Sequence, residues 1–400
     1  MLTLSDVSLP ESEKLFARSG LEAAFIVPTK NGMEKSIMDA TLPVREFLLR
    51  MGIHDFSAQG KGPGCKRCIT AHVINGEAVA CRTVSLYRPE TKDGDPRIWI
   101  YGLAEFATWG NLLALIVDGL NLYVVNCTTN NLQRILTDKE SVLGKIAAKA
   151  DIYAPVAKDL LEKLREVAAR GFVPNLRPGD TGVGYTLETH LGIKANARRA
   201  PDYHGIEIKS GRMGRKAKAA AGDRITLFSQ VPNWGISPLS ARATLESFGY
   251  RNGVGRLQLF CSIDARAPNR LGFRLAVRHD DAHLANVNHR RIDAGEDVFL
   301  WGLQVLREAF SEKHRETFWV GAVTRREGMH EQFHYVEARH TRRPMLATFD
   351  RLLEAGGICV DLTMSERGSQ KAVRDHGYLF RLYGPFFEEL FPQVGTYALT

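Results

Sequence analysis

The chain has 400 residues and a hydrophobic content of 44%, which allows buried cores and excludes a wholly disordered protein. This length exceeds what one compact domain usually needs, so we expect two domains. The formal net charge of +8 favours a polyanionic partner, and nucleic acid is the first candidate.

No targeting or membrane-spanning segment is expected. The amino terminus does not have the basic-then-apolar layout of a secretion signal. The longest apolar run, at 112–117, is too short to span a bilayer. We therefore expect a soluble, cytoplasmic protein.

The first 150 residues mix helical and strand patterns, which predicts an α+β domain with a twisted sheet. The predicted helices lie at 10–18, 40–51 and 105–117, and the predicted strands at 24–27, 97–101 and 121–127. Residues 69–84 predict a β-hairpin that turns at Asn75 and Gly76. Basic residues around this hairpin contact phosphates in one interpretation and form a solvated rim in the other: Arg82, Arg88, Lys92 and Arg97.

Three of the six cysteines lie near this hairpin. Cys65 and Cys68 form a CxxC pair, with His72 and Cys81 nearby, which raises the question of a structural zinc ion. There is no second pair, and the spacings fit no common zinc motif. We favour reduced thiols over zinc, and we expect the isolated Cys127, Cys261 and Cys359 to be buried.

Two helices are predicted to connect the halves of the chain. Residues 137–150 and 155–170 both carry apolar residues at helical spacing, and Gly171 with Pro174 ends the second helix. We therefore expect an N-terminal domain at 1–170 and a C-terminal domain at 171–400.

The segment 179–212 contains the strongest candidate site. Around 206–210 the residues alternate with period two, so Ile206 and Ile208 face one side of a strand. Glu207 and Lys209 are then expected on the opposite, open side. Asp202 precedes them after Pro201, in a bend of the chain.

The pattern Asp-x4-Glu-x-Lys suggests metal-dependent phosphodiester chemistry. Carboxylates that converge at a strand end bind Mg2+ through oxygen, and a neighbouring lysine can orient a water for attack on phosphate. The bare pattern also fits an ordinary solvated strand face.

A short helix precedes the strand. Thr181 is a candidate cap, Val183, Leu187 and Leu191 recur at i+4, and Gly192 is a stop signal. Glu188 lies beside this apolar stripe, so the helix can direct a third carboxylate at the same strand end.

The remaining sequence predicts further strands and helices and is rich in basic residues. Strands are predicted at 224–231, 256–263, 271–277 and 318–323, and helices at 237–248 and 297–310. Lys216 lies in a basic run that fits either a DNA-backbone contact or a solvated loop. Arginine and histidine are typical base-reading groups, although most protein–DNA bonds go to phosphates. The candidates are His334, His340, Arg342, Arg343, Arg374, His376 and Arg381.

The segment from about 171 to the end resembles the MvaI/BcnI restriction endonuclease family, in the MutH-related branch of the PD-(D/E)xK nuclease superfamily. The matching segments are GDTG at 179–182, TLE at 186–188, LG at 191–192, PD at 201–202, GIEIKS at 205–210, RDHG at 374–377 and FR at 380–381.

This resemblance implies a fold with a central mixed sheet flanked by helices. It implies a Mg2+-dependent enzyme, with Mn2+ able to substitute, that cuts double-stranded DNA and leaves 5′-phosphates. Asp202 and Glu207 would bind the metal, Lys209 would position water, and Glu188 would complete the catalytic cluster. Arg374, His376 and Arg381 would lie near the bases. It further implies a monomer and a role in restriction of foreign DNA.

The N-terminal extension departs from this family's pattern. We expect it to read or gate the target, for example through a modified base or a partner. Two alternatives share the same sequence features: a repair nickase triggered by a mismatch or lesion, and a non-catalytic DNA-binding protein with a vestigial site. The intact Asp202, Glu207 and Lys209 argue against the second.

Overall fold

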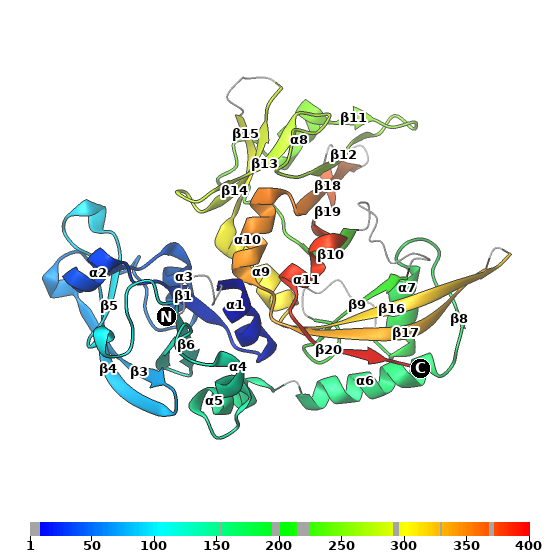
Figure 1. Ribbon diagram of the computed structural model, residues 1–400. Helices are drawn as coiled ribbons and strands as arrows, with labels where there is room; N and C mark the ends of the chain where they lie inside the picture. Colours follow the sequence, from blue (N-terminus) through cyan, green and yellow to red (C-terminus); the bar gives the residue numbers. More distant parts are fainter. Residues whose placement is uncertain are drawn as a thin grey trace. The chain divides into compact units, whose positions relative to one another are not determined.

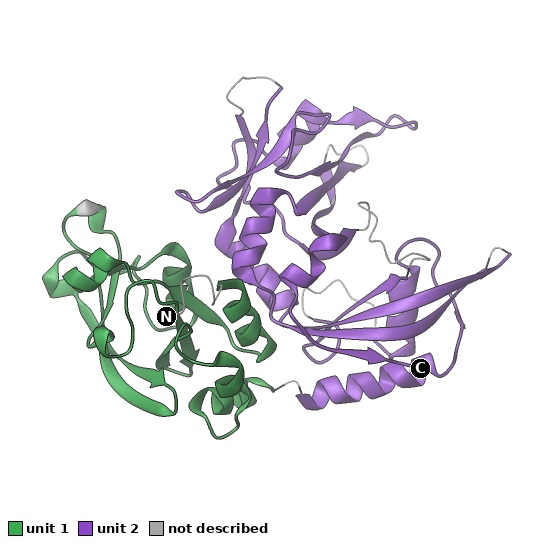
Figure 2. Cartoon of the chain, viewed as in Figure 1, with its two compact units in different colours: residues 1–152 green, residues 153–400 purple. Residues whose placement is uncertain are grey.

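The computed structural model describes residues 9–152, 154–193, 201–213, 224–290, 296–328, 330–367 and 372–400. The chain forms two compact units, Met1–Ile152 and Tyr153–Thr400, which Figure 2 colours separately. The division falls before the expected boundary at 170, because helix α6 (Ala154–Ala168) packs into the core of the second unit through Leu160 and Leu164. In the described ranges, no helix is long and apolar enough to cross a membrane.

A seven-stranded sheet organises the first unit (Figure 1). The strand order is β1-β6-β7-β3-β4-β5-β2, and the β3–β7 pair is parallel. The strands are β1 (Ala23–Ile26), β2 (Met38–Asp39), β3 (Arg67–Asn75), β4 (Ala78–Tyr87), β5 (Arg97–Ile100), β6 (Leu113–Asp118) and β7 (Asn121–Asn126). The helices are α1 (Leu9–Arg18), α2 (Lys30–Lys35), α3 (Leu42–Arg50), α4 (Leu132–Thr137) and α5 (Val142–Ala150). The α+β prediction for this unit is confirmed.

The predicted helix at 105–117 is wrong, because most of its apolar run forms strand β6. This strand lies between β1 and β7, and Leu113, Leu115 and Ile116 are all buried. A continuous apolar run has the same appearance in a buried strand and in a buried helix, since periodicity cannot separate them.

The hairpin predicted at 69–84 is present as β3 and β4, with Asn75 paired to Ala78 across the turn. Most of the basic residues around it bind other parts of the same unit. Arg82 pairs with Glu105, Arg97 pairs with Asp39, and Arg88 donates to the carbonyl oxygens of Gly94, Phe56 and Gln59. The side chain of Lys92 lies outside the described part.

The cysteines in the described chain are free thiols. Cys65, Cys68 and Cys81 are exposed, and the Cys81 Sγ lies 3.6 Å from Nδ1 of His72. The described residues contain no group of three His, Cys, Asp or Glu side chains that could hold a metal ion, at this hairpin or elsewhere. Cys127 and Cys359 are buried, as expected, whereas Cys261 is partly exposed.

The described residues of the second unit form three sheets (Figure 1). The first has the order β20-β17-β16-β9, with β8 paired to β17; the second is β10-β19-β18-β12-β11 and the third is β13-β14-β15. Its strands are β8 (Val173–Pro174), β9 (Glu207–Arg212), β10 (Arg224–Ser229), β11 (Tyr250–Arg251), β12 (Leu257–Ile263), β13 (Phe273–Arg278), β14 (His283–Asn288), β15 (Glu296–Gly302), β16 (Glu316–Glu327), β17 (His330–Arg342), β18 (Ile358–Arg367), β19 (Ala372–Tyr383) and β20 (Gln393–Ala398). Its helices, besides α6, are α7 (Gly182–His190), α8 (Ala241–Phe248), α9 (Leu303–Lys313), α10 (Leu346–Ala355) and α11 (Phe387–Leu390).

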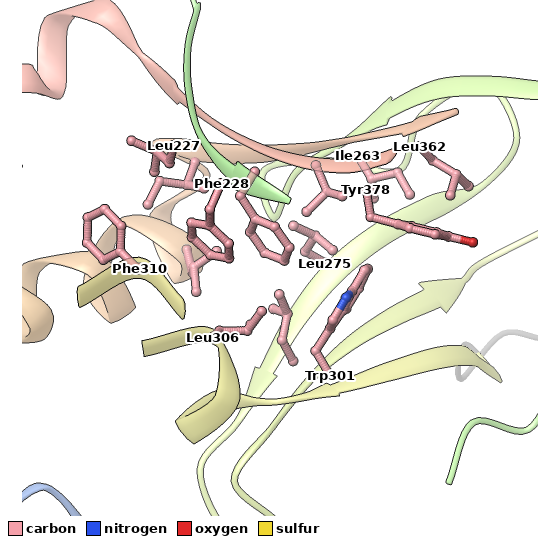
Figure 3. Close-up of a cluster of buried hydrophobic side chains, with 14 of the residues drawn as sticks. Leu227, Phe228, Ile263, Leu275, Trp301, Leu306, Phe310, Leu362 and Tyr378 are labelled. Carbon is pink, nitrogen blue, oxygen red and sulfur yellow. The ribbon is translucent and has the colours of Figure 1, made fainter. Parts of the chain in front are cut away.

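An aromatic core joins the second and third sheets to α9 and α10. Figure 3 shows part of it, with Phe228, Trp301, Phe310 and Tyr378 among the labelled side chains. Phe228 and Phe380 stack with ring centroids 4.7 Å apart. Burial of such large rings contributes a major share of the stability of this part of the fold.

The predicted helix at 297–310 is wrong in its first half and confirmed in its second. Its first part is strand β15, and α9 begins only at Leu303, after Gly302. Val298, Phe299 and Trp301 are buried in this strand and belong to residue types that favour strands. The apolar residues of β15 and of α9 follow one another along the chain, and together they have the spacing of a single helix.

Candidate active site

The candidate site lies at the start of β9. This strand pairs in parallel with β16, so that Glu207 lies opposite Thr317 and Lys209 lies opposite Trp319. The parallel β9–β16 pair and the antiparallel β16–β17 pair make the sheet mixed, as predicted for this unit. The alternating sequence therefore forms a strand where the prediction places it.

A tight turn brings Asp202 back beside the strand. Tyr203 and Ile206 exchange backbone hydrogen bonds of 2.8 Å, and both residues between them have positive φ, 46° at His204 and 94° at Gly205. The Oδ2 of Asp202 accepts a hydrogen bond of 3.2 Å from the N–H of Ile208. This turn explains why four residues separate the aspartate from Glu207.

Helix α7 carries Glu188 to the same place. Val183 and Leu187 are buried in the core, and the chain leaves the helix at Gly192 with φ 72°, as predicted. Thr181 occupies the N-cap position, as predicted, but its side chain makes no capping hydrogen bond. A Cβ added to Gly184 would lie 3.6 Å from both Glu188 Oε1 and Ser210 Oγ, so α7 and β9 approach closely here.

Glu207 is fully buried, which corrects the expectation that it lies on an open strand face. Its Oε1 lies 2.5 Å from Nζ of Lys209, and its Oε2 lies 2.7 Å from Nζ of Lys313. Both oxygens lack any further polar partner among the described residues. Because an isolated buried carboxylate is strongly destabilising, the two ammonium groups stabilise the charged form of Glu207 in its buried position.

The carboxylates at this site repel one another. Burial raises the pKa of Glu188, and the charges of Asp202 and Glu207 raise it further. Burial likewise raises the pKa of Glu207, against the ammonium charges of Lys209 and Lys313, which lower it. Negative charges that raise the pKa of a neighbouring carboxyl group form a site that a cation would stabilise.

The donor atoms suit a hard divalent cation. Asp202 and Glu207 offer carboxylate oxygens, which Mg2+ prefers, and Mg2+ usually retains several waters beside one or two protein carboxylates.

Lys313 is absent from the sequence-based candidates. It is the last residue of α9, and it reaches Glu207 only because α9 leads directly into β16, the neighbour of β9. A lysine in the last turn of an amphipathic helix is common, since it interacts well with the helix dipole. No local signal in the sequence distinguishes Lys313 from such a residue.

Several basic residues predicted to contact DNA have partners within the protein. His340 is buried, stacks on Phe318 and lies 2.5 Å from Oε1 of Glu316. Arg342 lies 3.2 Å from the same oxygen. His334 Nε2 lies 3.2 Å from the carbonyl oxygen of Ala168 on α6.

The remaining candidates differ in their surroundings. Arg374 is exposed on β19, whereas the side chain of Arg381 pairs with Asp361 at 3.1 Å. Arg343 donates its backbone N–H to the carbonyl oxygen of Arg315, with φ 40°. The side chain of His376 and the whole of Lys216 lie outside the described part.

Comparisons with known proteins bear on the second unit. The family model described as the MvaI/BcnI restriction endonuclease family matches residues 161–391. A solved structure described as "Restriction endonuclease MvaI-cognate DNA substrate complex" matches with a TM-score of 0.52 at 22% identity, covering 62% of this chain and 99% of that one. The structure of MvaI in the absence of DNA gives a TM-score of 0.37 at 21% identity, covering 60% of this chain and 96% of that one. No curated protein matches.

The structural likeness supports the restriction-endonuclease-like fold of the second unit. The family match spans more than half of the 400 residues and includes Glu188, Asp202, Glu207 and Lys209. The chain therefore belongs to the MvaI/BcnI restriction endonuclease family, a family of DNA-cleaving nucleases.

Proposed function

We propose that the second unit is a Mg2+-dependent endonuclease that hydrolyses double-stranded DNA at specific sequences and leaves 5′-phosphate and 3′-hydroxyl ends. One observation carries this proposal above the others: in a chain of a restriction endonuclease family, Glu207 is fully buried at the start of β9 and contacts the ammonium of Lys209, while Asp202 accepts a hydrogen bond from the N–H of the next residue, Ile208. The proposed setting is defence against foreign DNA.

Each side chain at the site has a proposed role. Asp202 and Glu207 hold the metal, and Mn2+ can replace Mg2+, since both accept carboxylate oxygens. When bound there, the cation would neutralise charge on the scissile phosphate and lower the pKa of a bound water. Lys209, with its side chain 30% exposed, orients the attacking water beside Glu207. Glu188 acts through an intervening water.

Duplex DNA is the proposed substrate, read by basic residues of the second unit. The MvaI structure that matches this unit is a complex with a cognate DNA substrate. Arg374 is exposed on β19 and is therefore the strongest of the candidates for a contact with a base. His334, His340 and Arg342 have partners within the protein, so we propose that they stabilise the fold rather than read DNA bases. We propose a monomer.

The first unit is proposed to read or gate the DNA target. It contains a recess of about 790 Å3 that is lined by Lys66, Tyr87, Trp99 and Tyr101, among others. The Nζ of Lys66 lies over the rings of both tyrosines, 5.7 Å and 5.5 Å from their centroids. Aromatic rings beside a lysine suit a nucleic acid, because they offer stacking surface and positive charge together.

The test is cleavage of unmodified phage and plasmid DNA with Mg2+, beside an EDTA control and the variant Lys209→Ala. Discrete fragments that disappear in both controls support a sequence-specific endonuclease. A mismatched duplex in parallel tests the repair nickase: cleavage of it alone, with unmodified DNA intact, would overturn the restriction function. Binding without cleavage of any substrate, in wild type and variant alike, would favour a non-catalytic protein.

A further inference from the structure

Lys313 links the core of the second unit to the candidate metal site. It is the last residue of α9, its Nζ lies 2.7 Å from Oε2 of Glu207, and its side chain is 19% exposed. The other oxygen of Glu207 contacts Lys209, so the carboxylate is bracketed by two ammonium groups. Lys209 comes from the same strand as Glu207, whereas Lys313 comes from a separate element.

The position of Lys313 is set by rigid parts of the fold. Leu306 and Phe310 of α9 are fully buried, and Arg307 pairs with Asp350 of α10 at 2.7 Å. The next residue, His314, is also fully buried, and its Nε2 lies 2.9 Å from the carbonyl oxygen of Leu227. The backbone at the end of α9 is therefore held in place, and Lys313 can move relative to Glu207 through its side chain.

Two ammonium groups and a divalent cation compete for the two oxygens of one carboxylate. A divalent cation on Glu207 needs at least one of the oxygens that the lysines contact, and like charges at this separation repel strongly in a water-poor site. Lys209 is two residues from Glu207 on one strand, and its position beside the metal is part of the proposed function. Lys313 is the group that can leave, because a flexible side chain attached to the helix end connects its ammonium to the site.

We infer that Lys313 is an internal counter-ion that occupies Oε2 of Glu207 in the metal-free protein and exchanges for the divalent cation. It offsets the negative charge of the carboxylate before metal arrives, and it lowers the affinity of the site for the cation. This inference rests on the proposed function, since it takes Glu207 as a metal ligand. Lys313 is thus a positioning residue for the metal site.

The first test measures cation binding without DNA. Mn2+ is titrated calorimetrically into wild type, Lys313→Met and Lys313→Arg. Removal of the competing charge should make Lys313→Met bind Mn2+ about tenfold more tightly, which corresponds to about 1.4 kcal/mol. In EDTA, Lys313→Met should unfold at a lower temperature than wild type. Addition of Mn2+ should raise its unfolding temperature by more than it raises that of wild type. Lys313→Arg keeps the charge and should resemble wild type in both measurements.

A second measurement uses the wild-type protein alone, so it does not depend on whether a variant folds. An amine-reactive acylating reagent is applied with and without Mn2+, and modification is quantified by peptide mass spectrometry. Modification of Lys313 should rise when Mn2+ binds, whereas Lys145, which is exposed on α5, should react equally in both conditions. Unchanged modification of Lys313 would overturn the exchange.

The outcomes separate this inference from the proposed function. Equal or weaker Mn2+ binding by Lys313→Met overturns the counter-ion role while Glu207 remains the metal ligand. Glu207→Gln supplies the reference, because it should abolish Mn2+ binding. If Glu207→Gln binds Mn2+ as wild type does, the proposed metal site itself fails, and the counter-ion role fails with it.

Discussion

The ammonium of Lys209 lies 2.5 Å from the carboxylate of Glu207, two residues earlier on the same strand. Strand periodicity places both side chains on one face, and burial of Glu207 makes the lysine its necessary partner. This contact joins a group that would bind metal to a group that would orient water, without any long-range element between them.

Lys209→Ala is expected to reduce single-turnover DNA cleavage with Mg2+ by at least about 100-fold, the usual scale for loss of a positioned proton-transfer or water-orienting group. EDTA should abolish cleavage by the wild type. Lys145→Ala is the matched control, since it removes an exposed lysine from α5 in the first unit, and it should cut at the wild-type rate. Cleavage by Lys209→Ala at the wild-type rate would contradict the assigned role.

The turn before β9 provides a second prediction. Gly205 has φ 94°, a region that costs other residues about 1–2 kcal/mol, so Gly205→Ala should be destabilising and should displace Asp202. Calorimetry should show weaker Mn2+ binding, and urea unfolding should show the lower stability. The neighbouring His204 also has positive φ, at 46°, so His204→Gly should keep Mn2+ binding intact. Equal binding by wild type and Gly205→Ala would show that the turn does not position Asp202.

His314 predicts how stability depends on pH. Burial lowers the pKa of His314 to about 3, and Lys209 and Lys313 contribute to this shift. The unfolded chain takes up a proton below about pH 6.5 while the folded protein does not, so stability falls as pH drops from 6.5 towards 3. At pH 5 this linkage costs the folded state about 2 kcal/mol.

The measurement is urea unfolding of wild type and His314→Gln at pH 7.5 and pH 5. The variant loses contacts at both values, but it also loses the proton linkage, so its stability deficit should shrink by about 2 kcal/mol at pH 5. Lys158→Gln, an exposed substitution on α6, should show the same difference from wild type at both values. A deficit for His314→Gln that stays constant with pH would count against a neutral buried histidine.

Lys66 tests the DNA-reading role of the first unit. Its Nζ lies 2.9 Å from the hydroxyl of Tyr101 within the recess, so Lys66→Glu places a negative charge there. If one phosphate contact is lost, the slope of log affinity against log salt concentration should fall by about 0.9. Lys145→Glu makes the same charge change on α5 of the same unit and should leave the slope unchanged. An equal effect of both substitutions would indicate a general charge effect.

The active-site segment was predictable because its information is local. The alternation of Ile206 to Lys209 specifies a strand through side-chain geometry, and a turn with glycine at positive φ places Asp202 beside it. The membership of the family follows from the same short motifs. By contrast, β6 and the first part of the 297–310 segment were predicted as helix, since an apolar run buried on both sides has no distinguishing period.

Burial and long-range contact were decided by the tertiary structure alone. The sequence determined that Glu207 and Lys209 share a strand face, but only the packed fold brings the end of α9 to Glu207 and makes Glu207 fully buried. The same packing pairs Lys313 with Glu207, and it sets His340 against Glu316 within the protein. Such pairs depend on how separate elements meet, and side-chain periodicity carries information only along one element at a time.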